Sequence, residues 1–567
     1  MVPAAYPAVS LLPFLAAAFA GGALALLTRR DERISTPIAA AALVLAIVAA
    51  AGIRSADPAD VGGSTLAGTE YARLFLLFGS IAGLLLTVLG LATTLPRDLP
   101  ASILVGLGAA GLALGSTDPV VAVLAASAGS FAGVFVTLAP PRSAVGAAIA
   151  ARELRALASA AGLAIVAAAW TARPIDVLAA EPAATGLAVL GLAAAVAIRS
   201  GAIPFHRWAA RLAEASPEIG LPILLAWGPA VLAVVAVGRL DASVAATRAP
   251  LDAERAIIVA VGAASLLLGV AAAYLHDDLG HIVAYSIIAD AGIVLLAFGT
   301  LDPTIWAPFR TWLLAFVVTK TAFAAWAAAM RSAFGARRLH DLGGWMRHTP
   351  VLAAALVVVA ITTIGWPGLV MFDARGDIVE AATGGPLTPI VLIGTLAHIG
   401  YFGRIVAAGL GRRTSTVAAG ADSRPTWRIH GAVRVADAAR IWDTNRAPTA
   451  AVVVLLLAGL ALAVAGGGFD LPRAAAGLPP RPTPGAPASP SPAPSDSPSP
   501  SLRPTAPPTP TGEPASGEPS AAGEQSPGAS GSAVASGSPL ESPLQSPPRV
   551  GSPSPEAPSF VPLGPAP

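Results

Sequence analysis

The sequence predicts an all-α polytopic membrane protein of about 14 transmembrane helices, and three observations carry this prediction. Of the 567 residues, 55% are apolar and only 12% are charged, and the mean hydropathy is +0.70. Such values lie outside the usual range of soluble globular proteins. Apolar stretches long enough to cross a bilayer recur along most of the chain. Arginines gather in alternate loops between these stretches, which is typical of a multi-pass topology.

The apolar stretches define the predicted helices one by one. They cover residues 5–27, 36–53, 72–94, 100–116, 119–139, 154–172, 183–203, 219–238, 256–275, 281–300, 305–330, 350–371, 387–410 and 448–467. Alanine and glycine dominate them, and such small residues let membrane helices approach one another closely. No lysine or arginine precedes the first stretch, so we expect an uncleaved span there rather than a signal peptide.

The distribution of arginine predicts an orientation in the membrane. Most arginines lie in loops after odd-numbered helices, such as Arg29, Arg142 and Arg337, and few lie after even-numbered ones, such as Arg54 and Arg239. The positive-inside rule then places the odd loops in the cytoplasm. We therefore expect a multi-pass protein of the bacterial plasma membrane with both termini outside.

Several classes of function are excluded by what the sequence lacks. It contains no cysteine, so it can form no disulfide, iron–sulfur cluster or haem thiolate. Its seven histidines show no zinc-binding spacing, and no phosphate-binding loop occurs. The net charge of +2 gives no sign of nucleic-acid binding. We expect no cofactor, no metal, no catalytic residue and no nucleic-acid partner, so energy must come from a partner chain or an ion gradient.

Lys320 is the only lysine in the chain, and it lies in the middle of the apolar stretch 305–330. About ten residues separate it from Arg310 and from Arg331, which is roughly 15 Å in a helix and corresponds to the bilayer centre. A lysine at that depth costs about 2.5–3.5 kcal/mol to insert. Because a buried lysine can release its proton and arginine cannot, this position predicts proton movement. A structural ion pair, or snorkelling to the interface, is the alternative.

Two prolines predict interruptions of helices within the membrane. Pro204 and Pro367 each follow an apolar stretch, and proline ends the helical hydrogen-bonding pattern. Broken helices in two halves of a transporter mark ion paths and indicate inverted repeats. An ordinary kink or helix end is the alternative at each proline.

Three segments together resemble one family of membrane proteins. They are Arg-Ser-Gly-Ala-Ile-Pro-Phe-His-Arg-Trp at 199–208 with Ala-Ser-Pro at 215–217, Asp-Leu-Gly-His-Ile-Val-Ala-Tyr-Ser at 278–286, and the stretch from Lys320 through His-Asp-Leu-Gly-Gly at 340–344 to Gly365–Arg375. In order and spacing they resemble the antiporter-like subunits of respiratory NADH–quinone oxidoreductase, membrane hydrogenases and multi-subunit cation/proton antiporters. The resemblance covers roughly residues 70–410.

The resemblance implies two inverted-repeat helix bundles and a row of protonatable side chains along the membrane midplane. Lys320 matches the central lysine of the family, while Arg199 and Arg375 stand where the lysines of the two halves would be. Trp227 or a neighbouring residue lies where a second lysine often follows, and Gly280 replaces another lysine. The acidic partner expected in the fifth helix is absent, because residues 124–134 contain no Asp or Glu.

Other titratable residues are candidates for a proton or ion path. Asp290, His206 and His281 lie in or beside predicted helices, and a carboxylate within a span is expensive unless it is paired or functional. Asp290 is interpreted as a relay or as half of a structural pair, and His206 as a relay or as a helix-end residue. His398 is interpreted as a hydrogen-bonded core residue, with a place in a relay as the alternative.

The acidic residues that flank Arg375 offer it a simple partner. Asp373 and Asp377 lie two residues before and after it in the chain. The expected arrangement is a local ion pair of Arg375 with one of them near the helix break.

Four regions are predicted along the chain. Residues 1–95 hold N-terminal transmembrane helices, 96–410 the antiporter-like core, 411–470 a cytoplasmic loop and the last helix, and 471–567 a disordered tail. From about Pro479 the tail consists largely of Pro, Ser, Gly and Ala, which cannot bury enough apolar area to fold. It could be a plain spacer or a tether to the cell wall or a partner.

The sequence therefore predicts a membrane subunit of a proton-translocating complex that conducts or couples protons, with sodium as an alternative ion. The expected partners are other membrane subunits and the lipid bilayer. The chain could belong to a translocase similar to NADH:quinone oxidoreductase, without a redox site of its own. The alternatives are a non-conducting structural paralogue and a membrane subunit of an inorganic-carbon uptake system.

Overall fold

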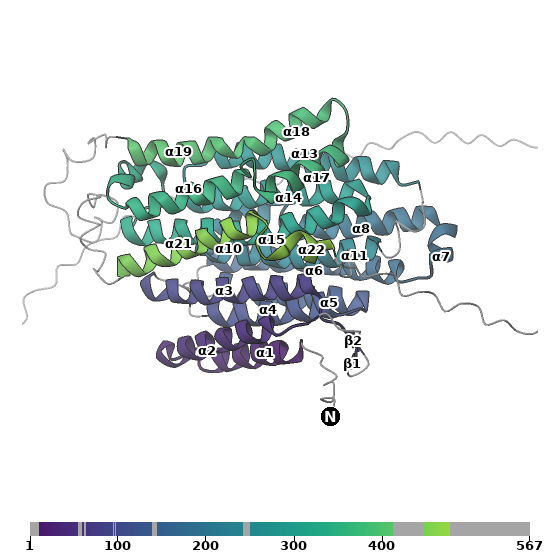
Figure 1. The fold of residues 1–567 in the computed structure, drawn as a ribbon, viewed down its shortest axis with the longest axis horizontal. Coiled ribbons are helices and arrows are strands. Elements are labelled where there is room, and N and C mark those ends of the chain that lie inside the picture. Colours follow the sequence, from purple (N-terminus) through teal and green to yellow (C-terminus); the bar gives the residue numbers. More distant parts are fainter. Residues whose placement is uncertain are drawn as a thin grey trace, which may run out of the picture. The chain divides into compact units, whose positions relative to one another are not determined.

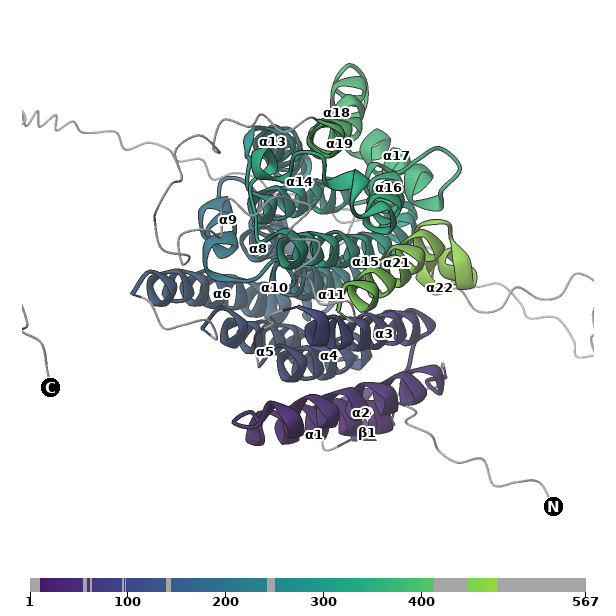
Figure 2. The same ribbon diagram turned by 90° about the vertical axis from the view of Figure 1, so that its left-hand side faces the viewer.

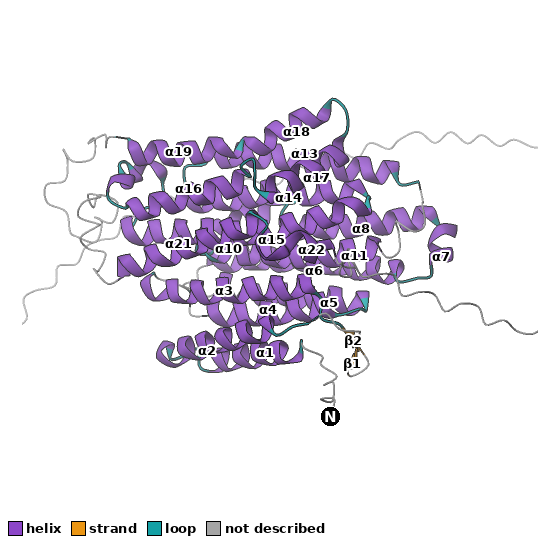
Figure 3. Ribbon diagram, in the orientation of Figure 1, coloured by secondary structure: helices purple, strands orange, loops and turns teal. Residues whose placement is uncertain are grey.

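The computed structural model describes residues 11–54, 59–61, 64–93, 96, 98–138, 144–241, 250–411 and 446–476. Within these residues the protein is helical apart from one antiparallel hairpin, β1 (Ala59–Val61) and β2 (Ser64–Leu66). The long helices run alongside one another (Figures 1 and 3). An all-α polytopic membrane fold is confirmed.

The first six helices precede the first helix break. They are α1 (Leu12–Leu27), α2 (Glu32–Ala51), α3 (Glu70–Ala92), α4 (Leu99–Gly115), α5 (Pro119–Leu138) and α6 (Ala144–Thr171). Consecutive members pack on one another, and α4 also packs on α1. Helix α3 continues the packing inward, because it contacts α15 and α21.

The central segment holds the longest helix, α15, and the first break. Its elements are α7 (Ile175–Ala180), α8 (Pro182–Ser200), α9 (His206–Ala215), α10 (Gly220–Pro222), the π-helix η1 (Ile223–Trp227), α11 (Gly228–Arg239), α13 (Asp252–Leu275), α14 (Leu279–Thr300) and α15 (Pro303–Phe334). A π-helical turn inside a longer helix is uncommon and is often found at functional sites.

The last described segment holds the second break. Its elements are η3 (Leu339–Leu342), η4 (Trp345–Arg347), α16 (Pro350–Ile364), α17 (Val370–Thr383), α18 (Leu387–Leu396), α19 (His398–Leu410), α21 (Arg446–Ala465), η6 (Gly468–Asp470) and α22 (Leu471–Ala476). The predicted start of the tail at residue 471 is wrong, because α22 is helical and packs on α15 and α3. The predicted loop from residue 412 to 445 and the tail from residue 477 onward lie outside the described residues.

Each of the fourteen predicted stretches contains a helix in the structure. Among the described residues, ten helices are long and apolar enough to cross a membrane, and a bent pair formed by Leu339–Arg347 and Pro350–Ile364 could add one more. Three further apolar helices are shorter: Leu12–Leu27, Leu99–Gly115 and Pro119–Val134. The number of about 14 spans stays a prediction.

Both predicted helix breaks are present. Helix α8 ends at Ser200, Gly201 adopts φ +67°, and the chain becomes helical again only at His206. Helix α16 ends at Ile364, Gly365 adopts φ +71°, and α17 begins at Val370. Positive φ is strained for any side chain with a Cβ, so glycine ends each first half.

Helix α15 lies at the centre of the described helices. In the most apolar window of α15 every residue is buried, and in that of α14 94% are. Seen end-on in Figure 2, α15 lies between α14, α16, α21 and the helices α10 and α11. Any polar side chain at the middle of α15 is therefore shielded from lipid on all sides.

The pairing of α13 with α14 depends on three glycines: Gly262 and Gly269 of α13 and Gly292 of α14. A Cβ at Gly292 would collide with the carbonyl oxygen of Gly262 and the backbone nitrogen of Leu266, so only glycine allows this approach. Gly162, in the middle of α6, serves as a matched comparison, because a Cβ added there would meet no atom within 4 Å.

Replacing glycine by alanine is expected to affect stability differently at Gly292 and at Gly162. Gly292→Ala should lower the thermal unfolding midpoint in detergent, because helix backbones must separate. Gly162→Ala should leave it unchanged or raise it, since alanine is favoured over glycine in a helix by about 1 kcal/mol. Equal midpoints for the two variants would contradict the close packing of α13 and α14.

Candidate functional site

Lys320 forms an ion pair with Asp290 in the middle of the helix bundle. Its Nζ lies 2.8 Å from Asp290 Oδ2, and the two side chains are 1% and 0% exposed. Lys320 comes from α15 and Asp290 from α14, which pack on each other. Two full charges so far from water remain stable only when they neutralise each other.

His398 completes a three-residue cluster around the Asp290 carboxylate. Its Nε2 lies 3.3 Å from Asp290 Oδ1, while its Nδ1 lies 2.7 Å from the Thr395 carbonyl oxygen. Because both ring nitrogens face oxygens that accept hydrogen bonds, Nδ1 carries a proton, and a second proton can lie between Nε2 and Oδ1. The sequence interpretation of His398 as a hydrogen-bonded core residue describes its Nδ1 and misses its Nε2.

Arg375 acts on this cluster from the break between α16 and α17. Its two terminal nitrogens donate to the carbonyls of Ile364 at 2.6 Å and Thr363 at 2.9 Å, which end α16. Its positive charge also acts on Asp290. The predicted ion pair of Arg375 with Asp373 or Asp377 is wrong, because the carbonyls freed by the break bind the guanidinium instead.

Arg199 occupies a comparable place in the other half. It is 3% exposed, its Nε donates to Ser130 Oγ at 2.8 Å, and its Nη1 donates to the Leu224 carbonyl at 2.6 Å. Leu224 belongs to the π-helix η1, so the guanidinium again binds irregular backbone. Gly228 leaves room for it, because a Cβ there would collide with Nη2.

A buried glutamate acts on Arg199 from a helix in which no acidic partner is predicted. No acidic residue lies at positions 124–134 of α5, but Glu153 of α6 is 0% exposed and its charge acts on Arg199. Glu153 lies within an apolar helix, so the sequence already marks it as an unusual acidic residue and a candidate for the site. The family resemblance points to the fifth helix alone, and a partner from the sixth is therefore missed.

A small cavity and a tryptophan lie between Arg199 and Lys320. The cavity has a volume of about 50 Å³. Its lining is largely apolar, with Arg199, Ser102 and Ser130 as the polar residues beside Trp227. Trp227 Nε1 donates to Thr321 Oγ1 at 3.0 Å, directly beside Lys320. Trp227, where the resemblance predicts a lysine, thus links η1 to α15 by a hydrogen bond.

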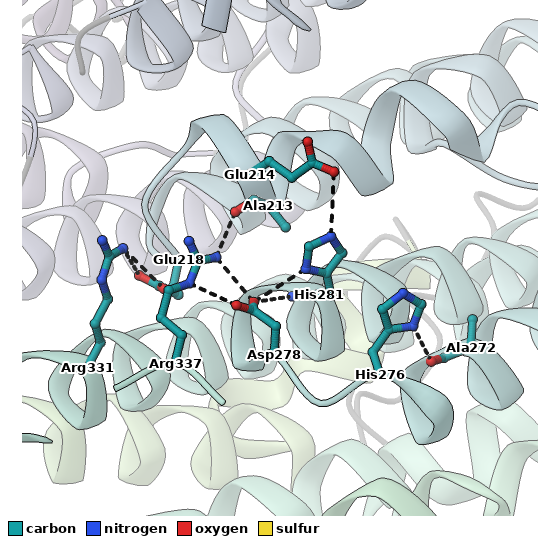
Figure 4. Close-up of polar contacts among 9 residues, drawn as sticks. All are labelled: Ala213, Glu214, Glu218, Ala272, His276, Asp278, His281, Arg331 and Arg337. Carbon is teal, nitrogen blue, oxygen red and sulfur yellow. Dashed lines mark hydrogen bonds and ion pairs between the residues drawn. The ribbon is translucent and has the colours of Figure 1, made fainter. Parts of the chain in front are cut away.

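His281 lies in a separate cluster at the start of α14 (Figure 4). Its Nδ1 lies 3.4 Å from Asp278 Oδ1, and its Nε2 lies 4.0 Å from Glu214 Oε1. Arg337 Nε is 3.1 Å from Asp278 Oδ2 and 3.3 Å from Glu218 Oε1. The cluster therefore ties the junction of α9 and α10 to the start of α14.

The resemblance predicts a lysine at position 280, where this chain has glycine. The guanidinium of Arg337 lies beside Gly280 and supplies a positive charge there. A Cβ at Gly280 would collide with Arg337 Nη2, which donates to the Ala213 carbonyl at 2.7 Å. A positive charge thus remains at this end of α14, although it comes from another part of the chain.

Only two of the six predicted site residues make direct contact with each other. Lys320 and Asp290 form the ion pair, and the charge of Arg375 acts on both of them. Arg199 belongs to the other half, and His281 belongs to the cluster of Figure 4. His206 is the first residue of α9, after the first break, and its Nδ1 is buried without a hydrogen-bond partner among the described residues. In the part of the chain that the structure describes, no three His, Asp or Glu residues are placed to hold a metal ion.

Comparisons with known proteins agree with this architecture. Residues 163–400 match the family described as NADH:quinone oxidoreductase/Mrp antiporter, transmembrane. NADH-quinone oxidoreductase subunit N of Laribacter hongkongensis is 26% identical over 256 residues, which are 44% of this chain and 52% of that protein. Subunit N 1 of Streptomyces griseus is 29% identical over 226 residues, or 39% of this chain and 46% of that protein. The chain thus spans about half the length of the curated relatives it matches.

Solved structures share the fold over most of the chain. A chain of the Mrp complex from Dietzia sp. DQ12-45-1b superposes with a TM-score of 0.63 at 19% identity, covering 82% of this chain and 96% of that one. A chain of respiratory complex I from Thermus thermophilus gives a TM-score of 0.59 at 20% identity, covering 82% and 100%. At this level of identity the likeness establishes the fold.

The cluster in Figure 4 makes stability depend on pH through Asp278. Burial raises the pKa of Asp278, but the hydrogen bond with His281 and the charge of Arg337 outweigh burial and hold the pKa below its usual value. A carboxylate with a lowered folded pKa stabilises the fold above its unfolded pKa, about 3.9, and this contribution is lost as the pH falls through the folded pKa.

Asp278→Asn should therefore lower the thermal midpoint at pH 7 and flatten its fall below about pH 5. The measurement is thermal unfolding in detergent across this pH range, with Asp176→Asn on the exposed start of α7 as the control. Identical pH profiles for Asp278→Asn and the unmodified protein would show that Asp278 is not bound as described.

Proposed function

We propose, on the premise that this chain belongs to the antiporter-like family of membrane subunits, that it is a membrane subunit of a proton-translocating complex. Protons pass through the buried cluster of Lys320, Asp290 and His398. The arrangement of two nitrogen bases on one carboxylate carries this proposal. Asp290 lies 2.8 Å from an amine and 3.3 Å from an imidazole nitrogen, so it can exchange a proton with either neighbour.

The chemistry of the cluster favours protons over sodium as the ion. Sodium, like other hard cations, prefers a shell of oxygen ligands. Asp290 instead faces Lys320 Nζ and His398 Nε2, which bind protons and offer no oxygen. The proposed role of the cluster is therefore proton transfer.

The two arginines at family lysine positions restrict where protons can move. Arginine keeps its proton in proteins, so Arg199 and Arg375 act as fixed charges and not as relays. Both are bound to backbone carbonyls, which holds them in place. Transfer is therefore concentrated at Lys320, and the half around Arg199 contributes a fixed positive charge.

The setting of the subunit completes the proposal. We place the loops after odd-numbered helices in the cytoplasm and both termini outside, on the distribution of arginine. Other membrane subunits are the proposed partners, because the similar proteins are subunits of NADH-quinone oxidoreductase and the similar structures are chains of the Mrp complex and respiratory complex I. The cluster in Figure 4 would then lie at the cytoplasmic ends of its helices.

A non-conducting structural subunit is the second candidate function. The observation that favours it is that Arg199 and Arg375 replace lysines and bind backbone carbonyls. In that case the pair of Lys320 and Asp290 would simply hold α14 and α15 together.

The substitution Lys320→Arg separates the two candidates, because it keeps the positive charge beside Asp290 and removes the group that can release a proton. In proteoliposomes containing the assembled complex, we expect proton flux to fall about tenfold or more while assembly is retained. Lys320→Met and Asp290→Asn should also abolish flux, and Arg347→Met, on an exposed residue, is the control.

Full flux with Lys320→Arg and with Lys320→Met, in normally assembled complexes, would overturn the proton-transfer role. Retained flux with Lys320→Arg but lost assembly with Lys320→Met would assign the pair a structural function instead.

A further inference from the structure

A hollow of about 810 Å³ lies at one end of the membrane-spanning helices. It is bordered by the start of α3, the junction of α4 with α5, the end of α11, the first turns of α15, and α22. Its volume falls within the range of ligand-binding pockets. We propose that this hollow binds a phosphate-bearing anion, either the headgroup of an anionic phospholipid or free phosphate.

Three arginines from three separate elements converge on the hollow. Arg239 ends α11, Arg310 lies in α15, and Arg473 lies in α22. Two carboxylates also line it, but Glu70 is already bound to Arg73 by hydrogen bonds of 2.9 and 3.0 Å. Asp470 is the other carboxylate of the lining, and the carboxylates of Asp118 and Asp241 act on Arg239 and Arg310 from nearby.

Arg310 has a buried hydrogen-bond donor that a bound anion could pair with. Its Nε is buried and has no hydrogen-bond partner among the described residues. A buried guanidinium nitrogen without a partner costs stability, and phosphate oxygens match the fork of donors that arginine presents. The Tyr71 hydroxyl donates to the Arg310 carbonyl at 3.2 Å and fixes the backbone from which this side chain extends.

The rest of the lining suits a phosphate at the membrane surface. Thr69 adds a hydroxyl donor, and Val234 and Val235 add an apolar wall. The hydroxyls of Ser116 and Thr117 already donate to the carbonyls of Asp118 and Thr65. Glu70 begins one span and Arg239 ends another, so the hollow lies at headgroup depth.

The site is independent of the proposed proton transfer. Arg310 and Lys320 are on the same helix, ten residues apart, which corresponds to roughly 15 Å. Loss of the anion site should therefore leave the cluster around Asp290 intact, and loss of flux should leave the anion site intact.

Thermal unfolding of the purified full chain, with added probes, tests the proposal. The probes are mixed micelles with phosphatidylglycerol, mixed micelles with phosphatidylcholine, and inorganic phosphate. We expect phosphatidylglycerol, inorganic phosphate or both to raise the midpoint, and phosphatidylcholine to have no effect. Arg310→Gln and Arg473→Gln should each weaken the response about tenfold or more. Arg33→Gln, on an exposed residue at the start of α2, should respond like the unmodified protein.

The outcomes separate the two sources of phosphate. A response to phosphatidylglycerol alone identifies a lipid site, and a response to inorganic phosphate identifies a site for the phosphate group itself. No response to either probe, or the same response with phosphatidylcholine, would overturn the proposal. Full responses in both Arg310→Gln and Arg473→Gln would overturn it as well. Arg473 is exposed on α22, so its variant remains informative if Arg310→Gln does not fold.

Discussion

The ion pair of Lys320 and Asp290 is the constraint on which the arrangement of the central helices depends. Two charges at the bilayer centre are stable only if they meet each other and are kept from lipid. The structure satisfies both conditions, because the pair is at most 1% exposed and α14 and α15 are surrounded by other helices. The glycine contact that lets α13 approach α14 helps to close this enclosure. To keep Lys320 away from lipid, helices that do not themselves contact it must also pack closely.

The two halves of the core use arginine in the same way, at different kinds of irregular backbone. Arg375 donates to the last carbonyls of α16 at the second break, and Arg199 donates to a carbonyl of the π-helix η1. Irregular backbone at membrane depth leaves carbonyls that must be satisfied within the protein. A guanidinium can bind two of them and keep its proton. Arginine thus caps irregular backbone at two positions where the family resemblance predicts lysine, and Lys320 is the one lysine of the chain.

Much of the fold could be predicted from the sequence, but the partners within the site could not. Long apolar stretches set the helices, and glycine with proline set the breaks, because these are local properties. Asp290 is unusual within its apolar stretch, yet its pairing with Lys320 depends on how α14 packs against α15. His398 comes from much later in the chain, so its Nε2 could not be assigned to Asp290. The partner of Arg375 was predicted wrongly, because carbonyls freed by a break leave no trace in the pattern of side chains.

The central claim is that the cluster of Lys320, Asp290 and His398 exchanges protons instead of forming an inert ion pair. Infrared difference spectroscopy of the reconstituted complex, comparing conditions with and without proton flux, tests it most directly. The account predicts a carbonyl band of a protonated buried carboxyl group that changes with flux and disappears in Asp290→Asn. Proton flux without any such band, or a band that persists in Asp290→Asn, would contradict the account.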